Sequence, residues 1–170
     1  MAKPSSFVFL FLLHCLMPSL AWTDASITTD KYALIALKSS ITSDPYNFLA
    51  NWSTFSPCNW VGVTCNAHHG RVHSLNLAGM DLRGTVSPQL GNLSFLVELD
   101  LSNNNLNGQM PAELVRLHRL RLFNFSYNDF HGQVPAWIGD LSILEHLNLR
   151  NNTFDGSIPP SLFNLTRLET

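Results

Sequence analysis

The fold is decided by the stretch from Leu96 to Pro111, which reads LVELDLSNNNLNGQMP. Its leucines follow the pattern L-x-x-L-x-L, and the alternation of apolar and polar residues in the second half is typical of a short strand. The pattern recurs every 24 residues, and its first apolar column holds Val72, Leu96, Leu120, Leu144 and Leu168. Self-similarity at a fixed period predicts a solenoid of stacked coils, whose short strands pair in parallel with those of the adjacent coils.

Two further columns indicate how each coil turns. The asparagine column holds Asn104, Asn128 and Asn152. A buried asparagine side chain both donates and accepts hydrogen bonds, so we expect a ladder in which each one serves its own coil and the adjacent coil. The proline column holds Pro111, Pro135 and Pro159. Because proline lacks an N–H group, we expect it where a returning strand has no partner to donate to.

Residues 26–71 are expected to form a helical N-terminal cap. Thr29 or Asp30 is a suitable residue to begin the helix. The apolar face of the helix is expected to comprise Leu34, Leu37 and Ile41, at helical spacing. We expect the helix to end at the Asp44–Pro45 pair. The bulk that covers the first coil is expected from Trp52 and Trp60.

The rest of the chain divides by the repeat. Residues 72–167 comprise four 24-residue units, and residues 168–170 start a fifth. The sequence therefore predicts an α/β repeat solenoid of the leucine-rich-repeat class. Solenoids need a capped end, and no C-terminal cap is recognisable, so we expect the chain to be a fragment or a truncated product of a longer solenoid.

Residues 1–25 are expected to be a signal peptide. An apolar run at 7–13 is followed by Pro18 and by the small residues of Ser19-Leu20-Ala21, which suit a cleavage site. The run is about half as long as the ~20 residues that a bilayer-spanning helix needs. An anchor that is not removed is the alternative. The signal peptide would direct the chain into the secretory pathway and to the cell exterior, and the chain would be soluble after cleavage.

The cysteine count agrees with that compartment. Cys15 would be removed with the signal peptide, which leaves Cys58 and Cys65 as an even pair. In a secreted chain such a pair predicts one disulfide bond. The short loop that it closes corresponds to roughly 2.5 kcal/mol in the chain-entropy treatment, which is enough to fix a local cap.

Composition and motifs argue against several function classes. The net charge is -2 and 13% of the residues are charged, so no basic surplus favours nucleic acid. Cys58, Cys65, His68 and His69 fit no standard zinc spacing. Glu98 and Asp100 are adjacent carboxylates on an open face, without a pocket that would shift their pKa values. We expect no catalytic residue, no metal and no cofactor.

The polar residues that alternate with the strand leucines are the expected binding surface. They include Ser74, Ser102 and Ser126, all expected to point outward. The candidate ligand contacts are Arg121, Glu145, His146 and Arg150, which lie on neighbouring strands. Four stacked strands offer about 400 Å², whereas a standard interface needs ~800 Å² per partner. The surface is therefore expected to hold part of a ligand site, with a merely solvated face as the alternative.

Five N-x-S/T sequons are present, at Asn51, Asn92, Asn124, Asn151 and Asn164. Each is an acceptor sequence for N-glycosylation in a secreted chain. Asn92 and Asn164 occupy the same repeat position, away from the strands, and are the favoured sites. A glycan at Asn124 would block the strand face and direct partners toward its edge.

The segment Cys58-Asn-Trp-Val-Gly-Val-Thr-Cys65, followed by 24-residue units with the element L-x-G-x-(I/V/M)-P, resembles the extracellular part of plant leucine-rich-repeat receptor-like kinases. The resemblance covers everything after residue 25. Phrases such as Leu90-Gly-Asn-Leu-Ser-Phe-Leu96 are most similar to the microbe-sensing branch, which implies signal perception in defence. The resemblance also implies a right-handed superhelix that binds a peptide or protein ligand, or a co-receptor, on its concave strand face or edge. It implies a single membrane span and a cytoplasmic Ser/Thr kinase beyond this chain. The chain itself would then lie at the outer face of the plasma membrane.

Two alternatives stay open. One is a soluble secreted inhibitor of a microbial cell-wall-degrading enzyme, built on the same repeat. The other is a short secreted decoy that pairs with a full-length receptor. The sequence downstream of codon 170 distinguishes these alternatives from a receptor. A receptor requires an apolar span and a kinase, an inhibitor requires a paired-cysteine cap, and a decoy requires a stop after Thr170.

Overall fold

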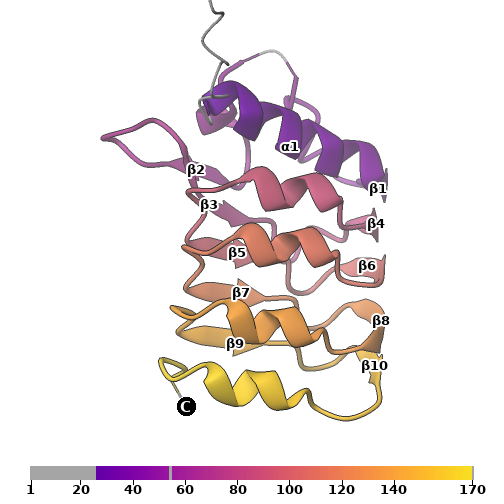
Figure 1. Cartoon of the computed structure of the whole chain (residues 1–170). Coiled ribbons are helices and arrows are strands. Elements are labelled where there is room, and N and C mark those ends of the chain that lie inside the picture. Colours follow the sequence, from indigo (N-terminus) through magenta and orange to yellow (C-terminus); the bar gives the residue numbers. More distant parts are fainter. Residues whose placement is uncertain (1–25, 54, 170) are drawn as a thin grey trace, which may run out of the picture.

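The chain folds into a stack of coils with a helical cap at one end, as the computed structural model in Figure 1 shows. The structure describes residues 26–53 and 55–169. The expected signal peptide at 1–25 lies outside the described residues. Each coil has three sides, because a strand, a second short strand and a 3-10 helix follow one another within every 24 residues.

The first sheet is made by the L-x-x-L-x-L segments. Its strands, in spatial order, are β2 (Val63–Cys65), β3 (Val72–Asn76), β5 (Glu98–Asp100), β7 (Leu122–Asn124) and β9 (His146–Asn148). The last four pair in parallel, and β2 pairs antiparallel with β3. Leu75, Leu99 and Phe123 are in register and fully buried. The constant repeat length thus stacks one apolar column from coil to coil.

A second sheet lies on another side of the coils and was not expected. Its strands, in spatial order, are β1 (Ile41–Ser43), β4 (Arg83–Thr85), β6 (Asn105–Gly108), β8 (Asp129–Gln133) and β10 (Thr153–Asp155). β4 to β10 pair in parallel, and β1 pairs antiparallel with β4. The returning strand therefore does have partners, contrary to the expectation from the proline column.

The prolines lie beyond this sheet, where they begin 3-10 helices. The N-cap positions of η3 (Ala112–Arg116), η4 (Ala136–Asp140) and η5 (Pro160–Asn164) are Pro111, Pro135 and Pro159. Their φ angles of -63°, -69° and -60° are those that the proline ring imposes. The prolines thus cost no strand hydrogen bond. η2 (Pro88–Asn92) has Ser87 at the same place.

The 3-10 helices of successive coils approach closely. Gly91 in η2 is buried, and a Cβ atom there would collide with the backbone carbonyl of Glu113 in η3. Gly139 in η4 has the same relation to Ser161 in η5. At these two positions glycine permits the close approach of the adjacent 3-10 helices, whereas Val115 occupies the same repeat position in η3.

The asparagine column joins the coils through buried hydrogen bonds. The Asn104 side chain donates from Nδ2 to the carbonyl oxygens of Leu77 (2.8 Å) and Leu101 (3.0 Å). Its Oδ1 accepts from the backbone N–H of Leu82 at 3.0 Å. Each of the other two side chains likewise donates to its own coil and the preceding coil and accepts from the preceding coil; these are Asn128 and Asn152. The ladder satisfies backbone groups that a turn would otherwise leave unpaired.

The cap is built on α1 (Ile27–Ser40) with η1 (Pro57–Asn59) beside it. The helix begins after Ser26, so the expectation that Thr29 or Asp30 caps it is wrong. It ends at Ser40, where the chain leaves for β1, and not at the Asp44–Pro45 pair. Within the described residues, no helix reaches the length and apolarity that a bilayer crossing requires.

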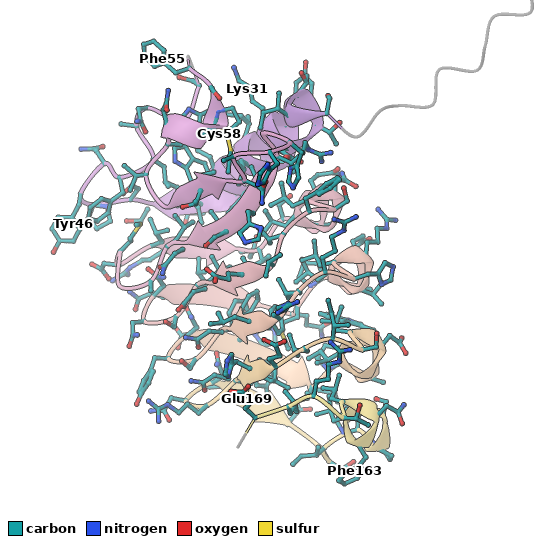
Figure 2. The ribbon with its side chains drawn as sticks, turned by 90° about the vertical axis from the view of Figure 1, so that its left-hand side faces the viewer. Lys31, Tyr46, Phe55, Cys58, Phe163 and Glu169 are labelled. Carbon is teal, nitrogen blue, oxygen red and sulfur yellow. A yellow bond between two sulfur atoms is a disulfide. The ribbon has the colours of Figure 1, made fainter. Side chains whose placement is uncertain are left out.

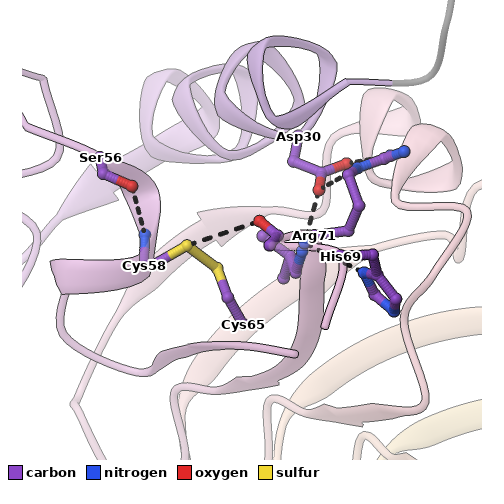
Figure 3. Close-up of a disulfide and its surroundings, with 8 residues drawn as sticks. Asp30, Ser56, Cys58, Cys65, His69 and Arg71 are labelled. Atoms are coloured by element: carbon purple, nitrogen blue, oxygen red, sulfur yellow. Dashed lines mark hydrogen bonds and ion pairs between the residues drawn. A yellow bond between two sulfur atoms is a disulfide. The ribbon is translucent and has the colours of Figure 1, made fainter. Parts of the chain in front are cut away.

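Asp30 has a different role, because it is buried in the first turn of α1 and faces the first coil (Figure 3). Its carboxylate accepts hydrogen bonds from Arg71 Nε (2.8 Å) and Nη2 (2.6 Å), and from the backbone N–H of Val72 (2.9 Å). Arg71 is also stacked on Phe95, with its Cζ 4.8 Å from the ring centroid. This pair ties the cap to the start of β3.

Two other features complete the cap. The disulfide Cys58–Cys65 is formed, with a Cα–Cα distance of 5.3 Å, which confirms the predicted pairing (Figure 3). The indole rings of Trp52 and Trp60 are buried and stacked, with centroids 5.3 Å apart. The tryptophans therefore do belong to the apolar core that begins under the cap.

Candidate binding surface

The open face of the first sheet holds a shallow hollow of about 470 Å³. Its apolar floor comes from Val97 and Leu122, both half-buried. Ionisable side chains surround this floor, namely His73, Glu98, Arg121, Glu145 and His146. The sheet positions them because the residue before β5, β7 and β9 and the first residue of each of these strands point away from the core, and His73 in β3 is in register with Val97. An apolar floor with an ionisable rim is the usual composition of a binding site.

Three of the four candidate ligand contacts meet at this hollow. Arg121 Nη1 and Glu145 Oε1 are 3.3 Å apart, with side-chain exposures of 53% and 27%. His146 Nε2 lies 3.7 Å from Glu169 Oε2. Ion pairs this exposed contribute at most about 1 kcal/mol, so a partner can replace them at little cost.

A second hollow of about 310 Å³ adjoins the first. Leu122 and His146 line both of them, and the two adjacent hollows are together called the groove below. Its other polar lining comes from Asn124, Asn148 and Glu169. Figure 2 places Glu169 beside the strand ends at the C-terminal end of the stack.

The fourth candidate, Arg150, does not join this group. It follows β9, and its guanidinium Cζ lies 4.9 Å from the ring centroid of Tyr127. Tyr127 is 39% exposed and has a φ of 55°, a conformation that bulky residues rarely adopt. The sequence analysis missed Tyr127, although Gly79 and Asn103 at the same repeat position indicate a turn with positive φ.

The outward Asp/Asn residues at the strand ends form a polar column whose hydrogen bonds were not predicted. Asp100 Oδ1 accepts from the backbone N–H of Ser102 at 2.9 Å, and Asn124 Oδ1 accepts from that of Ser126 at 3.2 Å. Asn76 and Asn148 make the same bond two residues on. Residues of this column on adjacent strands are also joined by a side-chain hydrogen bond, because Asn124 Nδ2 donates to Asp100 Oδ2 at 3.1 Å.

This column explains one error of the sequence analysis. Ser74, Ser102 and Ser126 were expected on the open face, but they are only 9%, 3% and 2% exposed. At Ser102 and Ser126 the preceding Asp or Asn side chain turns the backbone inward at the strand end. In β5, β7 and β9 the residues before and at the start of each strand, together with the Asp/Asn column, remain available to a partner.

The open face has an acidic surplus. The charged side chains described on it are Glu98, Asp100, Glu145 and Glu169 against Arg121 and Arg150. Among residues 26–53 and 55–169, no group of three or more His, Cys, Asp or Glu side chains is arranged to hold a metal ion. The surface is thus suited to non-covalent recognition of a partner with positive charge.

Comparisons with known proteins agree with this architecture. Residues 27–66 match the model of the leucine rich repeat N-terminal domain, and residues 95–117 and 144–165 match the Leucine Rich Repeat model. The LRR receptor-like serine/threonine-protein kinase EFR of Arabidopsis thaliana is 45% identical over 95 residues, which cover 55% of this chain and 9% of that kinase. The chain spans about a tenth of the length of such curated relatives or less.

Solved structures give the same result. The BIR2 ectodomain from Arabidopsis thaliana has a TM-score of 0.76 at 36% identity, covering 82% of this chain and 76% of that one. The LRR ectodomain of the receptor kinase SOBIR1 from the same plant has a TM-score of 0.70 at 32% identity, covering 84% and 76%. The PEPR1–AtPEP1 structure has a TM-score of 0.79 at 32% identity, covering 84% of this chain and 20% of that one.

The part that this chain shares with the kinases is therefore their repeat ectodomain, which is a binding fold and not the catalytic domain. The repeats, the helical cap and the disulfide agree with the architecture that was expected from the sequence. The chain belongs to the family of leucine-rich-repeat ectodomains of plant receptor kinases.

Proposed function

We propose that this chain is the N-terminal part of the extracellular binding domain of a receptor kinase, and that the open face of its first sheet contacts a peptide or protein partner. The observation that carries the proposal is the groove around Val97 and Leu122, with Arg121, Glu145 and His146 on its rim. PEPR1 is a neighbour whose structure is of a complex with AtPEP1, which supports a peptide as the partner class.

The charges make the partner more specific. Four carboxylates against two guanidiniums on the described open face favour a peptide segment that carries lysine or arginine. The small area of four strands supports a partial site, since a standard interface is about twice as large. Further repeats or a co-receptor would supply the rest.

The same proposal covers location and domain plan. The oxidised Cys58–Cys65 pair supports passage through the secretory pathway, with residues 1–25 as the removed signal peptide. Residues 26–71 would serve as the cap and residues 72–167 as four binding repeats, with the outer face of the plasma membrane as the destination. Signal perception in defence, which the sequence resemblance implies, is the proposed role.

The charge argument is tested with the full chain secreted from plant cells and a panel of synthetic extracellular peptides and receptor-kinase ectodomains. The double variant Glu98→Gln/Glu145→Gln removes two carboxylates from the groove rim. The matched control is Asp140→Asn/Asp155→Asn, because both side chains are exposed and lie outside the described groove. We expect the rim variant to weaken the binding of a basic peptide by roughly tenfold in Kd, about 1.4 kcal/mol, and the control variant to leave the Kd unchanged.

Equal effects of the two double variants would refute the assignment of the groove, and binding of neither peptides nor ectodomains would refute the function. The receptor part is tested separately by reading the full transcript beyond codon 170. An apolar span followed by a kinase glycine-rich loop is expected, and a paired-cysteine cap followed by a stop codon would contradict it.

A further inference from the structure

The five sequons differ in what their side-chain amides do. Asn51, Asn151 and Asn164 are exposed, and among the described residues their amides make no hydrogen bond. Asn51 lies in the cap, Asn151 in the turn after β9, and Asn164 in η5. An N-linked glycan replaces one hydrogen of the amide nitrogen and projects a bulky polar group. At these three positions it would enter solvent and break no contact.

Asn92 is an intermediate case. Its side chain is half-buried at the end of η2, and its Nδ2 donates to Gln89 Oε1 at 2.8 Å. Gln89 is exposed, so its flexible side chain can turn away, and the second amide hydrogen stays available. A glycan is therefore compatible with the fold here as well.

Asn124 differs from the other sequon asparagines because it lies within a strand of the sheet. It is half-buried within β7, and its neighbours in register are Asp100 on β5 and Asn148 on β9. Its Nδ2 donates to Asp100 Oδ2 at 3.1 Å, while its Oδ1 accepts from both the N–H and the Oγ–H of Ser126 at 3.2 Å and 2.8 Å. The adjacent strands are ~4.8 Å away, so their side chains flank anything attached to this nitrogen.

The sequon hydroxyl is also inaccessible at this position. Ser126 is 2% exposed, and its Oγ is bonded to the Asn124 side chain itself. A glycan would have to turn the amide out of the column, which would remove the partners of Asp100 Oδ2 and of the Ser126 backbone N–H together. These bonds are part-buried, so their loss costs about 1 kcal/mol each, and the turn that ends β7 contains the Ser126 bond.

We propose that the folded, exported chain carries N-linked glycans at Asn51, Asn92, Asn151 and Asn164 and none at Asn124. The donor is a polyprenyl-pyrophosphate-linked oligosaccharide. The amide nitrogen forms a bond to the anomeric carbon of the first sugar, the bond from that carbon to the phosphate oxygen breaks, polyprenyl pyrophosphate leaves, and the amide loses one proton. The sugars would then surround the first sheet and leave its open face bare. The inference rests on the passage through the secretory pathway proposed above.

The experiment maps occupied sequons on protein exported from plant cells. Peptide-N-glycosidase treatment in ¹⁸O water converts each occupied asparagine into labelled aspartate, which peptide mass spectrometry locates. The full chain is made once with its own N-terminus and once with an established signal peptide in front. The second sample separates the two proposals, because it enters the pathway even if residues 1–25 do not direct export.

Label at the four expected positions and none at Asn124 is the expected result. Labelled Asn124 in exported protein, or an unlabelled residue among the other four, would overturn the inference. Labelled Asn124 that is confined to the retained intracellular pool supports it, since those molecules fail to leave. If only the sample with the added signal peptide is exported and shows the expected pattern, the glycan assignment holds and the proposed export signal fails.

A pair of variants tests the cause. Asp100→Ala removes the acceptor of the Asn124 amide, and we expect label at Asn124 to rise from none to a measurable fraction. The control is Asp81→Gly, because Asp81 accepts from Asn105 Nδ2 at 2.6 Å in a contact between coils that involves no sequon, and glycine tolerates its positive φ of 52°. We expect it to leave the glycan pattern unchanged. Label at Asn124 with the control variant and not with Asp100→Ala would contradict the role of the column.

Discussion

Replacing Asn104 by leucine tests whether the asparagine ladder stabilises the stack by satisfying buried backbone groups. The two side chains are similar in size, so the change removes hydrogen bonds without a large cavity. It leaves the backbone N–H of Leu82 and the carbonyl of Leu77 without their partner, and both bonds are buried. At about 1–3 kcal/mol for each unsatisfied group, the expected loss in the free energy of unfolding is about 2–6 kcal/mol.

Asn152→Leu is the matched variant, because Asn152 makes the same contacts but is half-buried. Water can replace its bonds, so we expect a loss of only about 1 kcal/mol. Urea unfolding followed by tryptophan fluorescence measures both losses, and hydrogen exchange at the Leu82 amide locates the first. If Asn104→Leu costs no more than Asn152→Leu, burial does not set the strength of the ladder and the reasoning fails.

Three further predictions concern the cap and the coil spacing. Asp30→Ala leaves the buried Arg71 without its carboxylate and should cost about 3–5 kcal/mol in urea unfolding; adding Arg71→Met should recover part of that loss, and no recovery would contradict the pairing. Removing the disulfide by Cys58→Ser/Cys65→Ser should lower stability by roughly 2.5 kcal/mol, and exchange protection should fall in the cap before the repeats; uniform loss along the chain would argue against a local role. Gly91→Ala puts a methyl group against the backbone of the next coil and should lower stability by about 1–3 kcal/mol, whereas an unchanged melting temperature would show that the coils can separate freely.

The sequence predicted the first sheet well because the information is periodic and local. Each unit repeats the same apolar columns, so Leu75, Leu99 and Phe123 could be assigned to one interior without knowledge of distant contacts. The disulfide was equally accessible, since removal of Cys15 leaves a single possible pair.

The second sheet could not be predicted in the same way. Its strands contain at most one buried apolar side chain each, as at Leu106 in β6 and Phe130 in β8, which is too short a pattern to show a period of two. The Asp30–Arg71 pair joins residues 41 positions apart, and no repeat relates them. Ser102 and Ser126 were misplaced because a short side chain at a strand end is buried when its backbone turns inward.

Both sheets are closed at the same end by a strand of reversed direction, β1 in one and β2 in the other. A further 24-residue unit could not pair in parallel with β1 or β2 as the other units pair with one another. These two strands therefore terminate the stack at this end. Every later junction between coils presents the same two ladders to its neighbour. Gain or loss of whole units during evolution would therefore change the length of such an ectodomain. Its N-terminal cap and the register of its strands would stay constant.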